Sequence, residues 1–252
     1  MELTPPGLAF VQHARTVLAQ LEHLRADLQE YAKGIKGHLR VFANTTASSE
    51  FLPQVLRTFL IRHPDVNVDL RERSSDEIVR AVLDGQTDLG IVAGTVRTGQ
   101  LETIPYREDR LALVVAEGHP LADEASIDFV RTLDFDQIGL HEASAIHAFV
   151  RRVCDDLHRS PRFRIQVGNF ESACRMIEAG IGVGIVPTSA ALRHARTMAI
   201  RIVPLRDDWA LRRLVICARS LASLPSFALD LVELLEEDAR QAAAPPPGEP
   251  RR

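Results

Sequence analysis

The chain has 252 residues, of which 46% are hydrophobic and 25% charged, and its 34 acidic residues outnumber its 30 basic ones to give a formal net charge of −4. This composition is typical of a globular protein with one large domain or two smaller ones, and the lack of a basic excess argues against strong DNA binding by these residues alone. The cysteines, Cys154, Cys174 and Cys217, are scattered, and neither a signal peptide nor an 18-residue apolar run is present. We therefore expect a cytoplasmic protein with reduced thiols.

The first 33 residues predict one long helix, which begins after Thr4 and ends at Gly34. Apolar residues recur along it with alternating spacings of four and three, forming a heptad seam. The seam fits either a helix packed on its own domain or a dimerising helix, and its regularity favours the second. The predicted dimer contacts are Phe10, Val17, Leu21, Leu24, Leu28 and Tyr31.

From residue 38 onward, strand and helix patterns alternate, which predicts an α/β fold with a parallel sheet and right-handed crossovers. The first set has strands at 38–43, 66–72 and 88–94, helices at 49–63 and 76–85, and two further strands at 102–108 and 110–116. The second set has strands at 137–140, 162–168 and 182–187, helices at 144–159 and 170–179, then a strand at 212–218 and a helix over 224–240. Both sets contain a helix, a glycine-containing turn and a strand ending in GIV, which predicts two similar halves with a cleft between them.

Polar residues follow several of these strands, at the carboxyl ends where open parallel sheets bind ligands. Hydroxyls and free backbone N–H groups at helix starts suit an anionic or polar small molecule, although Ser, Thr and Asn are also ordinary N-caps there. Arg73 is either a counter-charge for such a ligand or, as we favour, a solvated arginine at a strand end. The candidate ligand contacts are Thr45, Thr46, Ser48, Ser49, Ser74, Ser75, His141, Ser144, Asn169 and Pro187.

Motifs that would indicate catalysis, a cofactor or a metal are missing from the sequence. The stretch HEASAIH separates its histidines by six residues, whereas the zinc motif HExxH separates them by four. Gly180, Gly182 and Gly184 precede a strand, so they predict a tight helix-to-strand turn and no dinucleotide fingerprint. We therefore predict no catalytic residues, no cofactor, no metal and no enzymatic activity.

Several stretches, in order, resemble landmarks of the LysR-type transcriptional regulators. LTPPGLAFVQHARTVLAQL is similar to the start of that family's linker helix. Four further stretches are similar to successive landmarks of the family's effector-binding domain. They are HLRVFANTTASSEFLPQVLRTFLIRHPDVNVDLRE, VRAVLDGQTDLGIV, LVVAEGHPLA and GIGVGIVP. The resemblance covers about residues 3–240. The family's N-terminal winged helix-turn-helix is absent from these 252 residues, so the resemblance implies that DNA is contacted only through that missing domain. The chain is then either part of a longer regulator or a free-standing effector module.

The resemblance also implies a fold, namely two Rossmann-like subdomains with a cleft between them, similar to type 2 periplasmic binding proteins and preceded by a long linker helix. It assigns residues 1–36 to the linker or dimerisation helix, 37–112 plus 219–240 to subdomain I, 113–218 to subdomain II and 241–252 to a disordered, proline-rich tail. A small effector, often a carboxylate, would bind in the cleft, with Thr46 and Ser74 at positions where the family commonly contacts it.

The family further implies a homodimer or homotetramer, in which helix 49–63 meets subdomain II of a neighbouring subunit. Two alternatives of the same fold remain open. A solute-binding protein would have a signal peptide and no heptad helix. A bilobal enzyme would have charged catalytic groups in its cleft, for which His141 and Glu142 are weak candidates.

Overall fold

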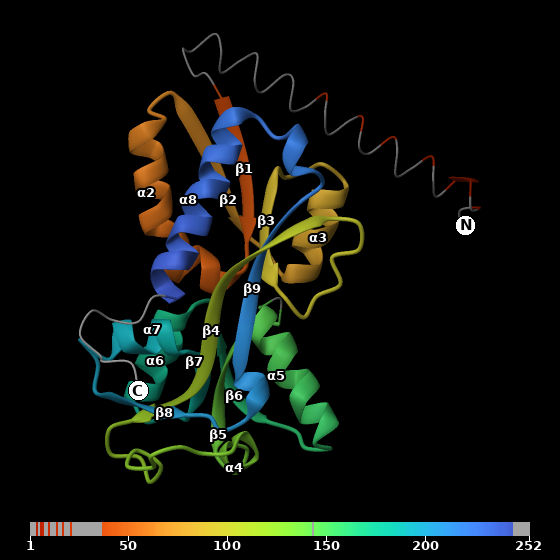
Figure 1. Cartoon of the computed structure of the whole chain (residues 1–252). Coiled ribbons are helices and arrows are strands. Elements are labelled where there is room, and N and C mark those ends of the chain that lie inside the picture. The colour runs from red at the N-terminus through yellow and green to blue at the C-terminus, as the bar shows by residue number, and fades with distance from the viewer. Residues whose placement is uncertain are drawn as a thin grey trace, which may run out of the picture. The chain divides into compact units, whose positions relative to one another are not determined.

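The computed structural model describes residues 37–142 and 144–243, together with Thr4, Pro6, Gly7, Phe10, Ala14, Val17 and Leu21 (Figure 1). The described residues divide into two compact units. Unit 1 contains those up to Ala43, Ala47–Arg107 and those from Leu214 onward, and unit 2 contains Asn44–Thr46 and Glu108–Arg213. The chain therefore passes between the units within two strands, β4 (Glu102–Ala116) and β9 (Leu211–Ala218). The boundaries expected from the sequence, 112/113 and 218/219, lie in the first of these strands and at the end of the second.

The N-terminal segment is helical at each described position from Pro6 to Leu21. The Thr4 hydroxyl oxygen accepts a hydrogen bond from the Gly7 N–H at 3.3 Å, as expected of an N-cap. Three predicted seam residues are exposed, Phe10 by 74%, Val17 by 55% and Leu21 by 51%. The other three, Leu24, Leu28 and Tyr31, lie outside the described residues.

The sheet of unit 1 has the strand order β2-β1-β3-β9-β4. Strand β1 (Gly37–Ala43) pairs in parallel with β2 (Val66–Glu72) and β3 (Leu89–Ala93), as the sequence predicts. Strand β9, to which the sequence assigned no orientation, pairs antiparallel with β3, so the sheet is mixed. The two strands expected at 102–108 and 110–116 are one continuous strand, because the charged run between them stays extended and its Asp109 is neutralised by a neighbouring strand.

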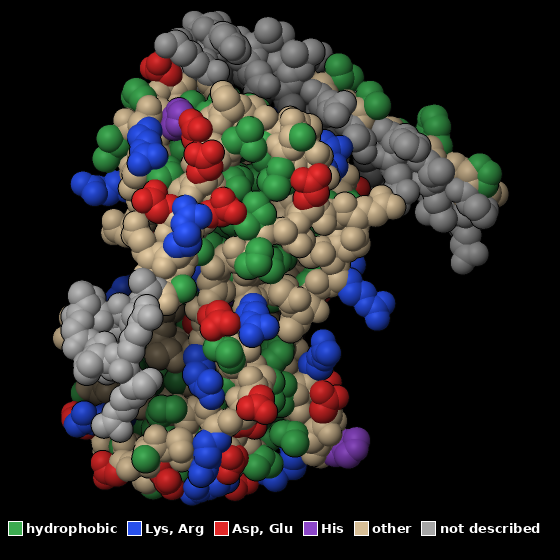
Figure 2. Space-filling model, in the orientation of Figure 1, with side chains coloured by type: hydrophobic (Ala, Val, Ile, Leu, Met, Phe, Trp, Pro, Cys, Tyr) green, Lys and Arg blue, Asp and Glu red, His purple; other side chains and the backbone are tan. Residues whose placement is uncertain are grey.

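Two helical layers cover the sheet of unit 1, because alternate residues of β1 point to opposite faces. Leu39 and Val41 join a core with α2 (Leu52–Arg62) and α8 (Ser226–Ala243), which lie side by side in Figure 1. Phe42 instead joins a core with α3 (Ser75–Leu83). Figure 2 shows that the outer face over α2 and α8 mixes acidic, basic and apolar side chains.

Two boundaries in unit 1 differ from the sequence expectation. The helix expected at 49–63 opens with a π-helical turn, Ala47–Phe51, and becomes α-helical at Leu52, where Pro53 occupies the first turn and its missing N–H is tolerated. Residues 241–243, expected in the disordered tail, continue α8, and the rest of that tail lies outside the described residues. The short 3-10 helix Leu221–Ser223 connects β9 to α8.

In unit 2, the second half of β4 pairs antiparallel with β7 (Gly184–Pro187) and β8 (Ile200–Pro204), while β5 (Asp136–Leu140) pairs in parallel with β6 (Arg162–Val167). One apolar core unites these strands with the four helices. The sequence predicts α5 (Ala145–Asp156) and α6 (Phe170–Glu178). It misses α4 (Phe129–Thr132), α7 (Thr188–His194), β8 and the 3-10 helix Asp208–Ala210. No helix in the described ranges is both long and apolar enough to cross a membrane.

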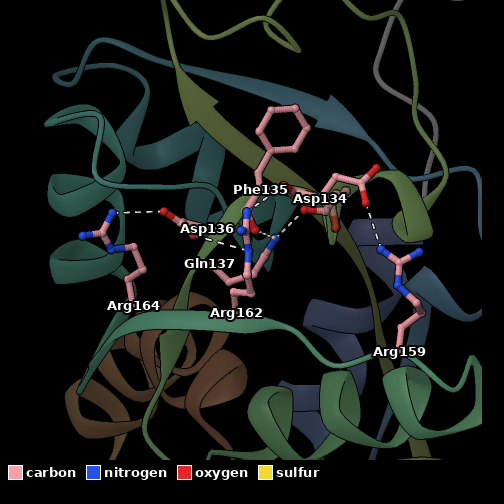
Figure 3. A network of polar contacts seen from close by, with 8 residues as sticks. Asp134, Phe135, Asp136, Gln137, Arg159, Arg162 and Arg164 are labelled. Atoms are coloured by element: carbon pink, nitrogen blue, oxygen red, sulfur yellow. Dashed lines mark hydrogen bonds and ion pairs between the residues drawn. The ribbon is translucent and has the colours of Figure 1, made fainter.

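Arginine–aspartate contacts bind the start of β5 to β6 and to the segment between α5 and β6 (Figure 3). The Asp136 carboxylate contacts Arg164 at 3.0 Å and Arg162 at 3.5 Å. Asp134 contacts Arg159 at 2.8 Å, and its carbonyl accepts a hydrogen bond from Arg162 at 2.8 Å. Each pair is largely exposed and contributes at most about 1 kcal/mol, but together they fix the strand pair whose carboxyl ends lead to the candidate residues of unit 2.

Candidate functional site

The candidate residues of unit 1 lie at the starts of its helices. The Ser74 hydroxyl accepts from the Glu77 N–H at 3.4 Å and donates to the Glu77 carboxylate at 2.7 Å, which also accepts from the Ser74 N–H at 3.0 Å. This capping box lowers the pKa of Glu77, chiefly through the Ser74 hydroxyl. The buried Ser75 hydroxyl accepts from the Ala93 N–H at 3.1 Å and so connects α3 to β3. Ser48 is half-buried and Ser49 exposed, both in the π-helical turn.

Two candidate residues of unit 2 are also helix caps. Ser144 is buried, and its hydroxyl accepts from the Ile146 N–H at the start of α5. Asn169 is exposed, and its side-chain oxygen accepts from the Ser172 N–H at 2.8 Å at the start of α6. Ser144 and Asn169 therefore act as N-caps, which is one of the two roles that the sequence allows for them. Their contact with a ligand remains a prediction.

The other candidates of unit 2 lie at strand ends. His141 follows β5 and is half-buried, and its N–H donates to the Val167 carbonyl while its carbonyl accepts from the Ser144 N–H. Pro187 ends β7, is buried and lies opposite Leu111 of β4. Thr45 and Thr46 follow β1 and are 7% and 2% exposed.

Thr46 belongs to a buried polar cluster that the sequence did not reveal. Arg212 of β9 donates to the Asp109 carboxylate of β4 at 2.6 Å and to the Thr46 hydroxyl oxygen at 3.1 Å, both through Nη2. Arg212 is 5% exposed and Asp109 4%. The Nε of Arg212 is buried and finds no hydrogen-bond partner among the described residues. We call these three residues the Thr46–Asp109–Arg212 cluster.

The adjacent residues of the two strands, Glu108 before Asp109 and Arg213 after Arg212, form a second ion pair at 3.1 Å. This pair is exposed to solvent, whereas the pair Asp109–Arg212 is buried. The difference follows from strand geometry, because successive side chains of a strand point to opposite faces of the sheet.

Arg73 and His147, which the sequence raised as a possible counter-charge and a possible metal ligand, both have contacts within the protein. Arg73 is exposed, donates to the Glu72 carbonyl at 2.7 Å and lies over the Phe42 ring at 6.0 Å, as a strand-end arginine does. His147, the second histidine of HEASAIH, is buried and stacks on Phe163 at 5.1 Å. In the described part of the chain, no three His, Cys, Asp or Glu side chains are placed to hold a metal ion.

Comparison with known proteins decides which family this arrangement represents. Residues 32–240 match the LysR substrate binding domain family. The chain belongs to that family. It therefore carries the effector-binding domain of a LysR-type regulator, and the expected α/β fold of two subdomains is confirmed.

The relatives of this LysR substrate-binding domain are transcriptional regulators and not enzymes. A probable RuBisCO transcriptional regulator of Thalassiosira pseudonana is 26% identical over 215 residues, which are 81% of this chain and 69% of that protein. The regulatory domain of CcmR from Synechocystis PCC6803, solved in complex with 2-PG, matches with a TM-score of 0.72 at 20% identity, over 81% of this chain and 98% of that one. The BenM effector-binding domain with its effector benzoate matches with a TM-score of 0.68 at 19% identity, over 86% and 99% of the two chains.

Proposed function

We propose that this LysR substrate-binding domain senses a small anionic metabolite, of which a carboxylate is the leading class, and passes the signal to the DNA-binding part of a cytoplasmic, homo-oligomeric regulator. The observation that carries the proposal is the family match over residues 32–240, together with a fold that BenM uses to hold the carboxylate benzoate. A ligand that favours one conformation or subunit arrangement shifts the equilibrium by its difference in affinity for the two states.

The proposed effector contacts remain the ten residues predicted from the sequence, and Thr46 supports the proposal better than Ser74. The Ser74 hydroxyl already donates and accepts within its own capping box. The Thr46 hydroxyl accepts from Arg212, which leaves its proton available to a ligand.

The proposal is tested by a thermal-shift screen against aromatic and aliphatic carboxylates, with the variants Thr46→Ala and Ser74→Ala. A ligand at 100 times its Kd stabilises the folded state by about 2.7 kcal/mol, which raises the melting temperature measurably. We expect a stabilising carboxylate whose effect is lost in Thr46→Ala and weakened less in Ser74→Ala. The matched control is Thr58→Ala, because Thr58 is a half-buried threonine of α2 whose hydroxyl donates to the Gln54 carbonyl of its own helix.

No stabilisation by any carboxylate at millimolar concentration would contradict the carboxylate class. Stabilisation that survives in both Thr46→Ala and Ser74→Ala would keep the function but place the ligand elsewhere.

Exposed apolar side chains support the homo-oligomeric part of the proposal. Phe10, Val17 and Leu21 of the N-terminal helix are each more than half exposed. On α2, which the family resemblance expects at a subunit contact, Ile61 is 67% exposed, and on α7 Leu192 is 57% exposed. Exposed apolar residues that recur along helices are typical of surfaces that another subunit covers.

A further inference from the structure

Two buried hydrogen-bond donors of the Thr46–Asp109–Arg212 cluster lack an acceptor in the described part of the chain. The first is the Nε–H of Arg212. The second is the Thr46 hydroxyl proton, because the hydroxyl oxygen accepts from Arg212, an arginine has no acceptor to offer in return, and no other described residue bonds to this hydroxyl. Thr46 is 98% buried, being 2% exposed. Protein structures rarely leave such donors unsatisfied, since each costs about 1–3 kcal/mol.

Both unsatisfied groups are donors, and this restricts what can satisfy them. A group that offered only N–H donors, such as an ammonium or an amidinium, would leave both unpaired and would compete with Arg212 for the Thr46 oxygen. A carboxylate or phosphate oxygen offers acceptors only and matches both. Asp109 is the acidic member of the cluster, and its charge is already paired with Arg212 at 2.6 Å, so the pair as a whole is neutral.

We propose that Arg212 is a positioning and specificity-determining residue, which fixes the Thr46 hydroxyl as a hydrogen-bond donor and so selects the oxyanion end of the effector. Asp109 holds the guanidinium in place through its short ion pair. This inference rests on the proposed function, because it names the part of the effector that the same site recognises. The two residues that position Thr46 come from strands β4 and β9, which lie far from Thr46 in the sequence.

The test uses pairs of probes that have the same shape but opposite hydrogen-bond polarity. Benzoate and acetate carry acceptors only, whereas benzamidinium and acetamidinium carry donors only. Binding of each probe to the 252-residue chain is measured by calorimetry at millimolar concentration. We expect the carboxylate of each pair to bind at least about tenfold more tightly than the amidinium, because a hydrogen bond to a charged group contributes that much or more.

Three variants separate positioning from a merely structural role. Thr46→Val keeps the shape of the side chain but removes the hydroxyl, and we expect it to lose about tenfold in carboxylate affinity, whereas Thr46→Ser keeps the affinity. The double variant Asp109→Leu/Arg212→Met removes the ion pair without leaving a lone buried charge, so it is expected to fold. In this double variant the Thr46 hydroxyl oxygen no longer accepts from Arg212, so the hydroxyl can accept as well as donate. We therefore expect the ratio of carboxylate affinity to amidinium affinity to fall. The matched control is Glu108→Gln/Arg213→Gln, which removes the neighbouring exposed pair and leaves the ratio unchanged.

The binding measurements distinguish the role of Arg212 from the proposed effector-binding function on which it rests. If neither carboxylate binds the wild-type chain, the carboxylate class proposed for the effector is contradicted and this inference falls with it. If a carboxylate binds but its affinity and its preference over the amidinium are the same in Thr46→Val and in the Asp109/Arg212 double variant, the function stands. In that case the inference is overturned, and the two donors are satisfied by water.

Discussion

At the scale of single residues, the buried ion pair Asp109–Arg212 makes a prediction about stability. Removing one partner leaves a buried charge without compensation, so Asp109→Leu or Arg212→Met alone is expected to lower the free energy of unfolding by about 3–5 kcal/mol. The double variant is expected to recover most of this loss, because two apolar side chains replace a pair whose mutual attraction is largely offset by desolvation. Urea unfolding followed by circular dichroism measures all three variants.

The exposed pair Glu108–Arg213 is the internal reference for that measurement. Its side chains are 58% and 76% exposed, so either single change is expected to cost less than about 1 kcal/mol. If the two losses at Asp109 and Arg212 simply add in the double variant, the buried pair is not a coupled unit.

His147 predicts a pH dependence of stability. Burial lowers the pKa of His147 below its ordinary value, and Arg151 lowers it further, while a hydrogen bond to the Leu140 backbone and the charge of Glu142 oppose the shift. The unfolded chain then binds a proton at a higher pH than the folded chain does, so the contribution of His147 is fully present above about pH 6.5 and is lost as the pH falls below it. We expect wild type to lose more stability than His147→Gln between pH 7.5 and pH 5.5 in urea unfolding. Equal losses in the two proteins would show that other groups carry the acid sensitivity.

Sequence reasoning found those polar residues whose role is local. Ser74, Ser144 and Asn169 each stand directly before a helix, and a cap needs only a neighbour two or three residues along the chain. Arg212 and Asp109 are 103 residues apart. In the sequence, Asp109 and Arg212 are each one charged residue among several. They contact each other only because β4 and β9 are neighbouring strands.

At the scale of elements, long periodic segments were predictable and short ones were not. The bounds of α3, α5, α6, β1, β2 and β6 differ from the predicted ones by at most three residues, and those of β2 coincide. Helix α7 has seven residues and β8 five, too short for a repeating apolar pattern to stand out. The continuity of β4 was missed for a different reason, since a charged run predicts a break unless its partner strand supplies the opposite charge.

The N-terminal helix carries the prediction about oligomeric state. Val17 and Leu21 are exposed apolar residues of the predicted seam, and an aspartate at either position would place a charge in the predicted helix–helix contact. We expect Val17→Asp/Leu21→Asp to lower the molar mass measured by light scattering at micromolar protein concentration. The control is Gln12→Asp, at a position that lies outside the heptad seam predicted from the sequence. An unchanged mass in the seam variant would contradict dimerisation through this helix.

At the scale of the whole molecule, each unit has a core of its own. The core of unit 2 is one cluster around Phe129, Phe170 and Ile177, and unit 1 has two clusters on opposite faces of its sheet. The three cysteines are buried, Cys154 and Cys174 in the core of unit 2 and Cys217 in a core of unit 1. The reactivity of each thiol therefore measures the unfolding of its own core. Burial raises the pKa of Cys217 to about 12 and also raises that of Cys154, so neither thiol is expected to react while its core is folded.

Gly90 offers a way to loosen one core without touching the other. A Cβ at this position would lie 2.6 Å from the Ile78 side chain and 2.7 Å from the Cys217 sulfur, so Gly90→Ala overpacks the α3 face of unit 1 at an expected cost of about 1–3 kcal/mol. We expect Cys217 to be alkylated by iodoacetamide at a lower urea concentration than in wild type, as read by mass spectrometry of the peptides. Cys154 and Cys174 should keep their wild-type midpoints, because their core contains no residue of unit 1. Gly118→Ala is the control, since a Cβ there meets no atom within 4 Å. If all three thiols shift together in Gly90→Ala, the two cores unfold as one cooperative unit, and independent stability of the two units is ruled out.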